Sequence, residues 1–342
     1  MRSLIKQLSD MRGISGFEYR ISDKIAELFM RYADEVRTDA LRNVIVVKEC
    51  HKPGAPKIMI EAHMDEIGLI VTSITDDGYL TFASVGGVDE RTLPSTEVVV
   101  HGRRDLNGVI GIKPASMLEA GKTVKMKDMA IDIGLDGEKA RSLVAVGDSI
   151  SLAQSVGALG KKQWSGKSLD DRASIAAILT AMKKLKNADL NVDVYAVAAV
   201  QEEVGCRGAK TAVYGIDPDM AIAIDVTHGI TPDNSNNAFK VGGGATISVG
   251  PNIHPKMAQR LFDTAKKYEI KVETEIDGGP TGTDAWVMQV SRAGVPTALL
   301  SIPLKYMHTS VETLAVSDVK AVAKLLTRFI KDLREDISWL KL

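Results

Sequence analysis

The chain has 342 residues, a formal net charge of −1 and 25% charged residues. A chain of this length forms one large domain or two modest ones, with enough apolar material for a buried core. The balanced charge lacks the positive excess that nucleic acids and anionic membranes attract, so we expect no nucleic-acid partner and no membrane partner.

Cysteine usage and the N-terminal pattern narrow the class of protein further. Cys50 and Cys206 are too few for a disulfide framework and have no metal-binding spacing, so we expect both to be reduced. Residues 1–8 have an amphipathic helical pattern instead of a secretion signal. Since no apolar run approaches the roughly 20 residues of a membrane-spanning helix, we expect a cytoplasmic protein.

The first part of the chain predicts two short helices and then strands. Helix-like patterns cover residues 3–12 and 18–32, and strand-like alternation covers residues 36–47. An apolar strand over residues 57–62 then leads into His63 and Asp65, whose spacing places both side chains on one face of an extended chain. A histidine after a strand is usually structural, but the aspartate two residues later makes a metal site an equally good interpretation.

Residues 67–161 have a different texture, with short β-rich runs separated by turn signals such as Gly86-Gly87 and Asn107-Gly108. We expect an inserted small β-barrel or sandwich here. Because this segment has no dense polar cluster, an assembly or lid role is predicted for it. His101 is expected on its surface.

The α/β pattern resumes with Asp170 and Asp171 at the start of a helical run over residues 173–185. One aspartate at this position is explained as a helix cap, whereas the second is not. Residues 192–200 form the next apolar strand, which ends at Glu202 and Glu203. Adjacent carboxylates repel when buried, so they are either a solvated strand end or need a shared proton, a basic partner or a metal cation.

The last third of the chain adds two further strands with chemistry-bearing residues nearby. Asp225 ends an apolar strand over residues 220–225, and His308 follows a core strand over residues 297–302. His228 is expected at the surface or as an outer neighbour of the site. Other expected elements are a helix opened by Pro255, an edge strand over residues 271–276, and a final helix to about residue 333 capped by Ser317-Asp318.

Together these strand ends and helix starts supply imidazoles and carboxylates, from His63, Asp65, Asp170, Asp171, Glu202, Glu203, Asp225 and His308. This donor set suits two divalent cations, with Zn or Co favoured and Mn also acceptable. Two close cations need a bridging carboxylate, for which Asp170 is the candidate, and a separate base that moves a proton from water to the leaving group. The Glu202-Glu203 pair can supply one ligand and one base.

The chain also contains, in order, the motifs Gly13-Ile14-Ser15-Gly16-Phe17-Glu18, Glu61-Ala62-His63-Met64-Asp65-Glu66-Ile67-Gly68, Leu169-Asp170-Asp171-Arg172, Gln201-Glu202-Glu203-Val204-Gly205, Asp225-Val226-Thr227-His228, Gly282-Thr283-Asp284-Ala285 and Tyr306-Met307-His308-Thr309. In these motifs and their order, it resembles the TET-type M42 family of dinuclear metallo-aminopeptidases over essentially its whole length.

The resemblance implies roles for individual residues. It implies that one metal is held by His63, Asp170 and Asp225 and the other by Asp170, Glu203 and His308. Glu202 would be the catalytic general base, and Asp65 would assist catalysis by orienting His63. The peptide bond between Asp170 and Asp171 would be cis.

The resemblance also implies an architecture. We expect an α/β fold in which residues 1–66 and 162–342 form a mixed-sheet metallopeptidase domain between helices, with the inserted β-barrel-like domain over residues 67–161 mediating dimerisation. Dimers would assemble into a hollow tetrahedral dodecamer that admits peptides with free N-termini. The preferred N-terminal side chain does not follow from the motifs.

Two other functions fit parts of the pattern. Paired carboxylates also serve glycoside hydrolases, and some relatives carry endoglucanase labels, but the histidines at strand ends favour metal chemistry. The third reading is a scaffold that binds peptides without cleaving them, which is disfavoured because every expected ligand position is filled.

Overall fold

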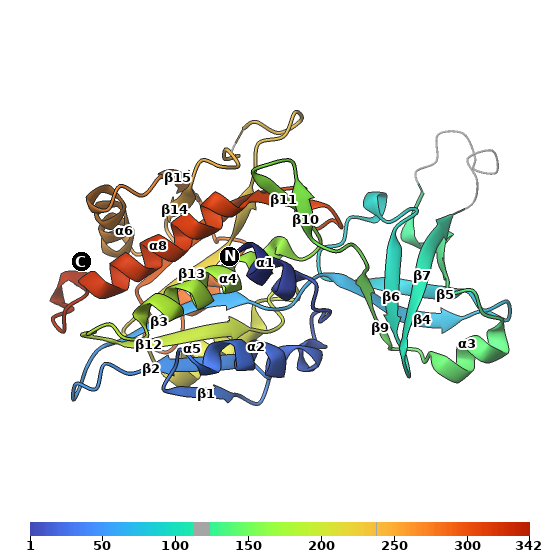
Figure 1. Ribbon diagram of the computed structural model, residues 1–342, viewed down its shortest axis with the longest axis horizontal. Coiled ribbons are helices and arrows are strands. Elements are labelled where there is room, and N and C mark those ends of the chain that lie inside the picture. Colours follow the sequence, from blue (N-terminus) through green and yellow to red (C-terminus); the bar gives the residue numbers. More distant parts are fainter. Residues whose placement is uncertain (113–123, 237) are drawn as a thin grey trace.

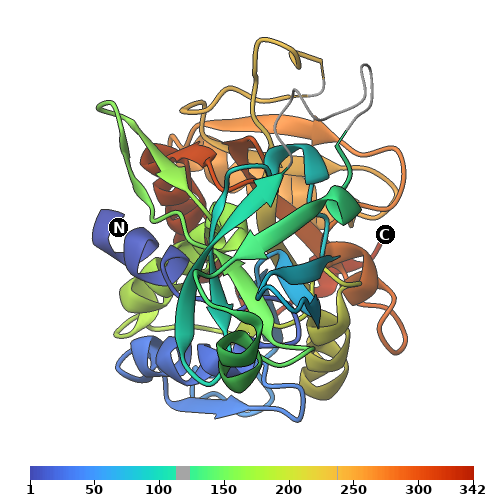
Figure 2. The same ribbon diagram turned by 90° about the vertical axis from the view of Figure 1, so that its right-hand side faces the viewer.

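The computed structural model describes residues 1–112, 124–236 and 238–342 (Figure 1). A large α/β part makes up one end of the elongated molecule, and a small β-barrel projects from it (Figures 1 and 2). Within the described ranges, no helix has the length and apolar character needed to cross a membrane.

The large part is built on a mixed sheet, which runs in the order β1-β2-β12-β3-β13-β16-β17-β11-β10, with β14 pairing with both β15 and β16. Its strands are β1 (Glu35–Thr38), β2 (Val44–Lys48), β3 (Lys57–His63), β10 (Gly157–Leu159), β11 (Gln163–Gly166), β12 (Asp193–Ala199), β13 (Met220–His228), β14 (Ala245–Val249), β15 (Val272–Ile276), β16 (Thr297–Lys305) and β17 (Glu312–Ala315). The pattern over residues 36–47 is thus an antiparallel strand pair, β1 and β2. As expected, β15 lies at an edge, paired with β14 among the described strands.

Two groups of helices pack against this sheet. In one group α4 contacts α1, α8 and strands β3 and β13, and in the other α5 contacts α7 and β12. The helices are α1 (Arg2–Ser9), α2 (Ser22–Met30), α3 (Gly137–Leu143), α4 (Leu169–Leu185), α5 (Arg207–Ile216), α6 (Pro255–Lys267), α7 (Ala285–Gln289) and α8 (Val316–Asp332), with single 3-10 turns at Glu18–Arg20, Glu90–Thr92, Met126–Asp128 and Ser338–Leu340. The predicted α/β class with a mixed sheet is confirmed.

The insertion forms a closed barrel in the order β4-β5-β8-β7-β6-β9. Its strands are β4 (Gly68–Ile74), β5 (Leu80–Val85), β6 (Glu97–His101), β7 (Asp105–Ile112), β8 (Met129–Asp132) and β9 (Ser149–Leu152). The barrel has its own apolar core, separate from that of the large part. The last barrel strand, β9, ends at Leu152, and the next strand, β10, already pairs with β11 in the large sheet. The domain boundary at residue 161 is therefore kept as a proposal.

His101 does not lie on the barrel surface as expected. Its side chain is buried, with Nδ1 2.8 Å from Asp105 Oδ1 and Nε2 2.8 Å from Ser151 Oγ. Because Val98 and Val100 of β6 face the barrel core, His101 lies on the other face of this strand, where it lines a cavity with Arg12 and Arg20 of the large part. The two hydrogen bonds satisfy its ring nitrogens.

Four parallel strands create the edge at which the predicted site residues meet. Strands β12, β3, β13 and β16 run in the same direction, with Ala199 opposite His63 and Ala223 opposite Glu61. Continuing the second register places Asp225 level with His63 on the neighbouring strand, about 4.8 Å away in the hydrogen-bonding direction. The carboxyl ends of parallel strands are where open α/β sheets collect reacting groups.

Two predicted helix caps are wrong. Asp170 and Asp171 have non-helical backbone angles within the first turn of α4, and neither caps it. Helix α8 starts after Ala315 without a side-chain cap. The Asp318 carboxylate instead accepts hydrogen bonds from the backbone amides of Gly242 and Gly244 at 2.7 and 3.1 Å, and so fixes a distant turn.

Candidate metal centre

Every predicted ligand lies at this edge of the sheet. His63 ends β3, Glu203 follows β12, and His308 lies beyond β16. Asp225 lies inside β13, which continues for three residues past the end predicted for it. Asp170 is joined to Asp171 by a cis peptide bond, as the family resemblance implied.

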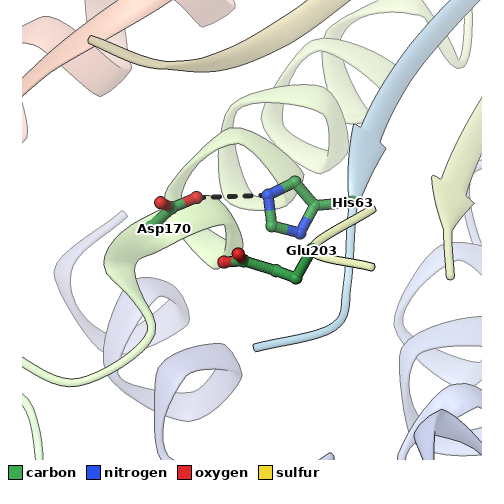
Figure 3. A group of neighbouring side chains, drawn as sticks. All are labelled: His63, Asp170 and Glu203. Atoms are coloured by element: carbon green, nitrogen blue, oxygen red, sulfur yellow. Dashed lines mark hydrogen bonds and ion pairs between the residues drawn. The ribbon is translucent and has the colours of Figure 1, made fainter. Parts of the chain in front are cut away.

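Asp170 lies between the two imidazoles. Its Oδ1 is 3.1 Å from Nε2 of His63, and its Oδ2 is 3.4 Å from Nε2 of His308 (Figure 3 shows the first contact). The same Nε2 of His308 is 3.3 Å from Glu203 Oε2. One carboxylate therefore faces a different imidazole with each oxygen, which is the arrangement that a bridging ligand needs.

Both imidazoles present the nitrogen that a cation would take. Nδ1 of His63 lies 3.2 Å from the carbonyl oxygen of Asp65, and Nδ1 of His308 lies 3.0 Å from that of Gly87. A carbonyl oxygen can only accept, so each Nδ1 carries a hydrogen, and Nε2 is the nitrogen that a cation could take once its own proton has been lost. This second-ring-nitrogen contact is typical of metal-ligating histidines.

Two close groups of side chains have the chemistry of metal ligands; both contain His63, and neither is identical to a ligand set implied by the family resemblance. Candidate ligand atoms lie within 4.8 Å of one another in the group His63, Asp170 and Glu203 and in the group His63, Asp171 and Asp225. Both oxygens of Asp171 are buried without a hydrogen-bond partner, and burial raises the pKa of this group well above its usual value, as expected for a carboxyl that binds either a proton or a cation. Imidazole and carboxylate donors accept Zn, Co and Mn.

The shifted pKa values reflect an excess of buried negative charge among these side chains. Burial raises the pKa of Glu203 to about 8, and burial together with the charge of Asp170 and other neighbours holds that of Asp225 well above its usual value. Burial disfavours the charged form of His308, but its hydrogen bond to Asp170 and the charge of Glu203 raise its pKa to about 10. The metal-free cluster therefore holds protons in the places where cations would bind.

Glu202 stands beside this cluster without belonging to either group. It lines a cavity of about 490 Å³ together with His63, Asp170, Glu203, Asp225 and His308. Burial is the main reason that its pKa rises to about 8. Its Oε1 accepts a hydrogen bond from the buried thiol of Cys206 at 3.4 Å, and with Asp284 these residues form a third close group. Cys206 and Cys50 are both free thiols.

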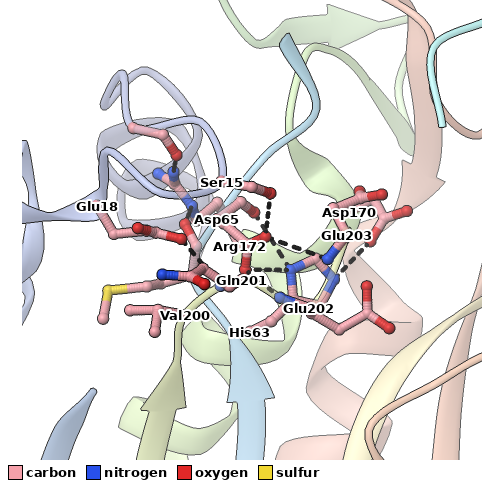
Figure 4. A network of polar contacts seen from close by, with 12 residues as sticks. Ser15, Glu18, His63, Asp65, Asp170, Arg172, Val200, Gln201, Glu202 and Glu203 are labelled. Atoms are coloured by element: carbon pink, nitrogen blue, oxygen red, sulfur yellow. Dashed lines mark hydrogen bonds and ion pairs between the residues drawn. The ribbon is translucent and has the colours of Figure 1, made fainter. Parts of the chain in front are cut away.

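Asp65 organises the residues around His63 (Figure 4). Its carboxylate accepts hydrogen bonds from the hydroxyl of Ser15 at 2.5 Å and from the backbone amides of Glu202 and Glu203 at 3.1 and 3.2 Å. Although burial opposes its ionisation, the contact with His63 holds the pKa of Asp65 below its ordinary value. One side chain thus fixes the ends of β3 and β12 together.

The N-terminal segment supports the same region. The buried guanidinium of Arg172 donates to the carbonyl oxygens of Met64 at 2.5 Å and Leu8 at 2.7 Å. Glu18 Oε1 accepts from the backbone amides of Gly16 and Gln201, both at 2.9 Å. The Gly13–Glu18 motif therefore stabilises the backbone next to the site but does not line its cavity.

Two contributors were missed by the sequence reasoning. Glu312 is buried, and its two oxygens accept from the backbone amides of Asp170 at 3.0 Å and His308 at 3.1 Å. Gly87 comes from the inserted module, and a Cβ there would lie 2.7 Å from Nδ1 of His308. A lone glutamate in a short strand gives no signal, whereas the Gly86-Gly87 pair was visible but was interpreted only as a turn.

The cavity continues away from the cluster. His228, expected at the surface or as an outer neighbour, is exposed and forms part of its wall. The remaining lining residues are Gly87, Val226, Thr227, Glu275, Asp277, Thr281, Gly282, Thr283, Leu299, Ser301 and Met307. The reacting centre therefore opens into a space large enough for a side chain or a short peptide.

Comparison with known proteins gives a consistent result. The profile of the family described as M42 glutamyl aminopeptidase matches residues 42–325. A lysyl aminopeptidase of Pyrococcus furiosus is 37% identical, with 97% of each chain covered. An aminopeptidase structure from Desulfurococcus kamchatkensis has a TM-score of 0.92 at 36% identity, covering 99% of this chain and 96% of that one.

The TET1 peptidase of Pyrococcus horikoshii, which can assemble into a tetrahedron or a large octahedral shell, has a TM-score of 0.87 at 34% identity, with 97% and 99% covered. All of these likenesses extend over both the large sheet and the barrel. The chain belongs to the M42 glutamyl aminopeptidase family.

Proposed function

We propose that this peptidase is a dinuclear metal-dependent aminopeptidase that removes N-terminal residues from peptides, with Glu202 as the general base. The observation that carries the proposal is the position of Asp170 between the Nε2 atoms of His63 and His308, in the same cavity as the side chain of Glu202. The named activities of the relatives support the substrate class.

The proposed ligands divide into two sets that share one residue. His63, Asp170 and Asp225 would hold one ion, and Asp170, Glu203 and His308 the other. When bound, two divalent ions polarise a carbonyl and lower the pKa of water. Zn and Co are the favoured ions, and Mn is also compatible with these donors.

Glu202 would take the proton from the attacking water and give it to the leaving amine. A base for this task works best when its pKa lies near the working pH, and burial moves Glu202 in that direction. Cys206 hydrogen-bonds one carboxylate oxygen and leaves the other available to the cavity. Asp65 would position both the base and His63, because it holds the backbone of Glu202 and contacts the imidazole ring.

The experiment is hydrolysis of a panel of aminoacyl-p-nitroanilides by the metal-loaded protein, the chelated protein and the Glu202→Gln variant. We expect chelation to abolish cleavage and added Zn or Co to restore it. Glu202→Gln should lose about 10²- to 10⁴-fold in kcat, the usual contribution of a general base, and should still bind two ions by elemental analysis. If the loaded wild-type protein releases no residue from these substrates or from free peptides, the proposal is wrong.

The same chelation step separates the glycoside hydrolase interpretation, since two carboxylates acting on a sugar need no cation. A peptide-binding scaffold without activity would bind peptides in the cavity and release nothing. We further propose that the barrel pairs two chains and that six such dimers form a tetrahedral dodecamer, as supported by the assembly named for the TET1 relative.

A further inference from the structure

Two acidic side chains in the cavity have no part in the proposed metal chemistry. Six carboxylates line this space, and four of them are Asp170, Glu202, Glu203 and Asp225. The other two are Glu275, near the end of β15, and Asp277, just after it. Three ligand carboxylates facing two divalent ions are already compensated, so the charge of the remaining pair faces the space that substrate would enter.

Glu275 is held by a pocket of hydroxyl groups. The hydroxyl of Thr227 donates to its Oε1, and those of Thr246 and Ser248 donate to its Oε2 at 2.7 and 3.4 Å. All three donors are buried, at 6%, 0% and 0% exposure. Three hydroxyls on one carboxylate fix its direction, while none of them supplies a compensating charge.

Asp277 adds a second negative group with unused capacity. Its Oδ2 is shielded from solvent and has no hydrogen-bond partner. In the part of the chain that the structure describes, no lysine, arginine or histidine nitrogen lies within 4.0 Å of either Glu275 or Asp277 in an ion pair. His228 also lines the cavity and, unlike His63 and His308, is not a proposed metal ligand.

Glu275 is linked to the proposed metal ligands through Thr227 of β13. Thr227, which donates to Glu275, is two residues after Asp225 on β13, so both point to the same face and their Cα atoms are about 6.6 Å apart. Leu299 and Met307 give the cavity wall an apolar portion. An apolar wall that ends in fixed negative charge matches a flexible aliphatic stem with a cationic head.

We infer that Glu275 and Asp277 form the pocket for the side chain of the substrate's N-terminal residue and select lysine and arginine. This inference rests on the proposed function and names its substrate class. A glutamyl residue would place its carboxylate against two others without a cation to offset them, so the family description does not predict the preference of this chain. The rival role for the pair is to bind the α-ammonium group, which every substrate carries.

The test compares kcat/KM for L-lysyl-, L-norleucyl- and L-glutamyl-p-nitroanilide in the metal-loaded protein. Norleucine has the same four-carbon stem as lysine without the ammonium group, so the ratio of the two isolates the charge. We expect lysine to exceed norleucine by about tenfold or more, and Glu275→Gln or Asp277→Asn to reduce that ratio about tenfold. Glu273→Gln is the matched control, because it removes a carboxylate from the same strand outside the cavity.

Two outcomes overturn the inference. Either the wild-type protein prefers norleucine or glutamate to lysine, or Glu275→Gln and Asp277→Asn lower all three substrates equally, as binders of the α-ammonium group would. Binding of L-lysinol and L-norleucinol, which contain no hydrolysable bond, is measured by calorimetry in parallel. Tighter binding of lysinol without any hydrolysis would support the pocket and refute the proposed function, whereas hydrolysis without a lysine preference would do the reverse.

Discussion

At the scale of single residues, the site depends on the Asp65 carboxylate, which holds the groups around His63 in place by accepting their hydrogen bonds. Asp65 receives hydrogen bonds from one hydroxyl and two backbone amides and contacts His63, so its loss would loosen four groups at once. Ser15 shares the same carboxylate through a single hydroxyl. Substituting Asp65 therefore removes several contacts, whereas substituting Ser15 removes only one of them.

We expect Asp65→Asn to weaken metal binding by about 10- to 100-fold, the usual effect of losing the partner of a ligating histidine. The asparagine amide can accept at one end only, so one backbone amide or the imidazole loses its partner. Competition with a chromogenic chelator measures the affinity. Ser15→Ala is the control and should lose much less; equal affinities in all three proteins would show that Asp65 does not orient His63.

Metal binding should also strengthen as the pH rises. Burial raises the pKa of Glu203 to about 8, and contacts with Asp170 and Glu203 raise that of His308 to about 10 against the effect of burial. Both groups are therefore protonated at pH 6 without metal and must lose their protons to act as ligands. Since each released proton adds about tenfold in affinity per pH unit, Zn titrations at pH 6, 7 and 8 should show a steep rise. A pH-independent affinity over this range would contradict the protonated state of the metal-free cluster.

At the scale of elements, buried charges join the end of β3 to the start of α4. Lys167 Nζ lies 2.5 Å from Glu66 Oε2, with both side chains 2% exposed, and also donates to the carbonyl oxygen of Ser9 at 2.8 Å. Arg172 makes parallel contacts to the loop after β3 and to α1. These links, and not helix caps, determine where the Asp170-Asp171 segment lies.

Removing only one partner of the Lys167–Glu66 ion pair should lower the free energy of unfolding more than neutralising both partners. We expect Lys167→Met to destabilise the protein by about 3–5 kcal/mol, because the carboxylate of Glu66 would stay buried without its cation. Urea denaturation of the metal-free protein reports the change. The double variant Lys167→Met with Glu66→Gln should recover part of the loss, and additive losses in this cycle would mean that the two charges do not interact.

At the scale of the whole molecule, the features predictable from the sequence are those that have a local pattern. Apolar strands followed by polar residues predicted the site edge at His63, Glu202 and His308, and the turn-rich texture predicted the barrel. The roles of Glu312, Arg172 and Gly87 depend on contacts between segments far apart in the chain, which have no local signature. The aspartates at the starts of α4 and α8 have a local capping pattern that predicted the wrong contact, because tertiary contacts place these side chains elsewhere.

The proposed assembly predicts a native mass of about 440 kDa, which is twelve copies of the 36.8 kDa chain. Light scattering coupled to size-exclusion chromatography measures it for the metal-loaded and the chelated protein. We expect the loaded protein to be a dodecamer and the chelated protein to be smaller, because the ligands come from segments spread along the chain. A loaded protein that stays monomeric would rule out the assembly, and a chelated protein that remains dodecameric would show that it does not depend on metal.

The order of the ligands along the chain also matters while the protein is being made. The proposed set begins at His63 and is completed only by His308, which is 34 residues from the last residue of the sequence. Glu312, which holds the backbone at His308, comes later still. A growing chain on the ribosome therefore has the base and most of the ligands but not the complete centre. On the proposed ligand assignment, a growing chain that has not yet released His308 and Glu312 would therefore have no complete metal centre and no peptidase activity of its own.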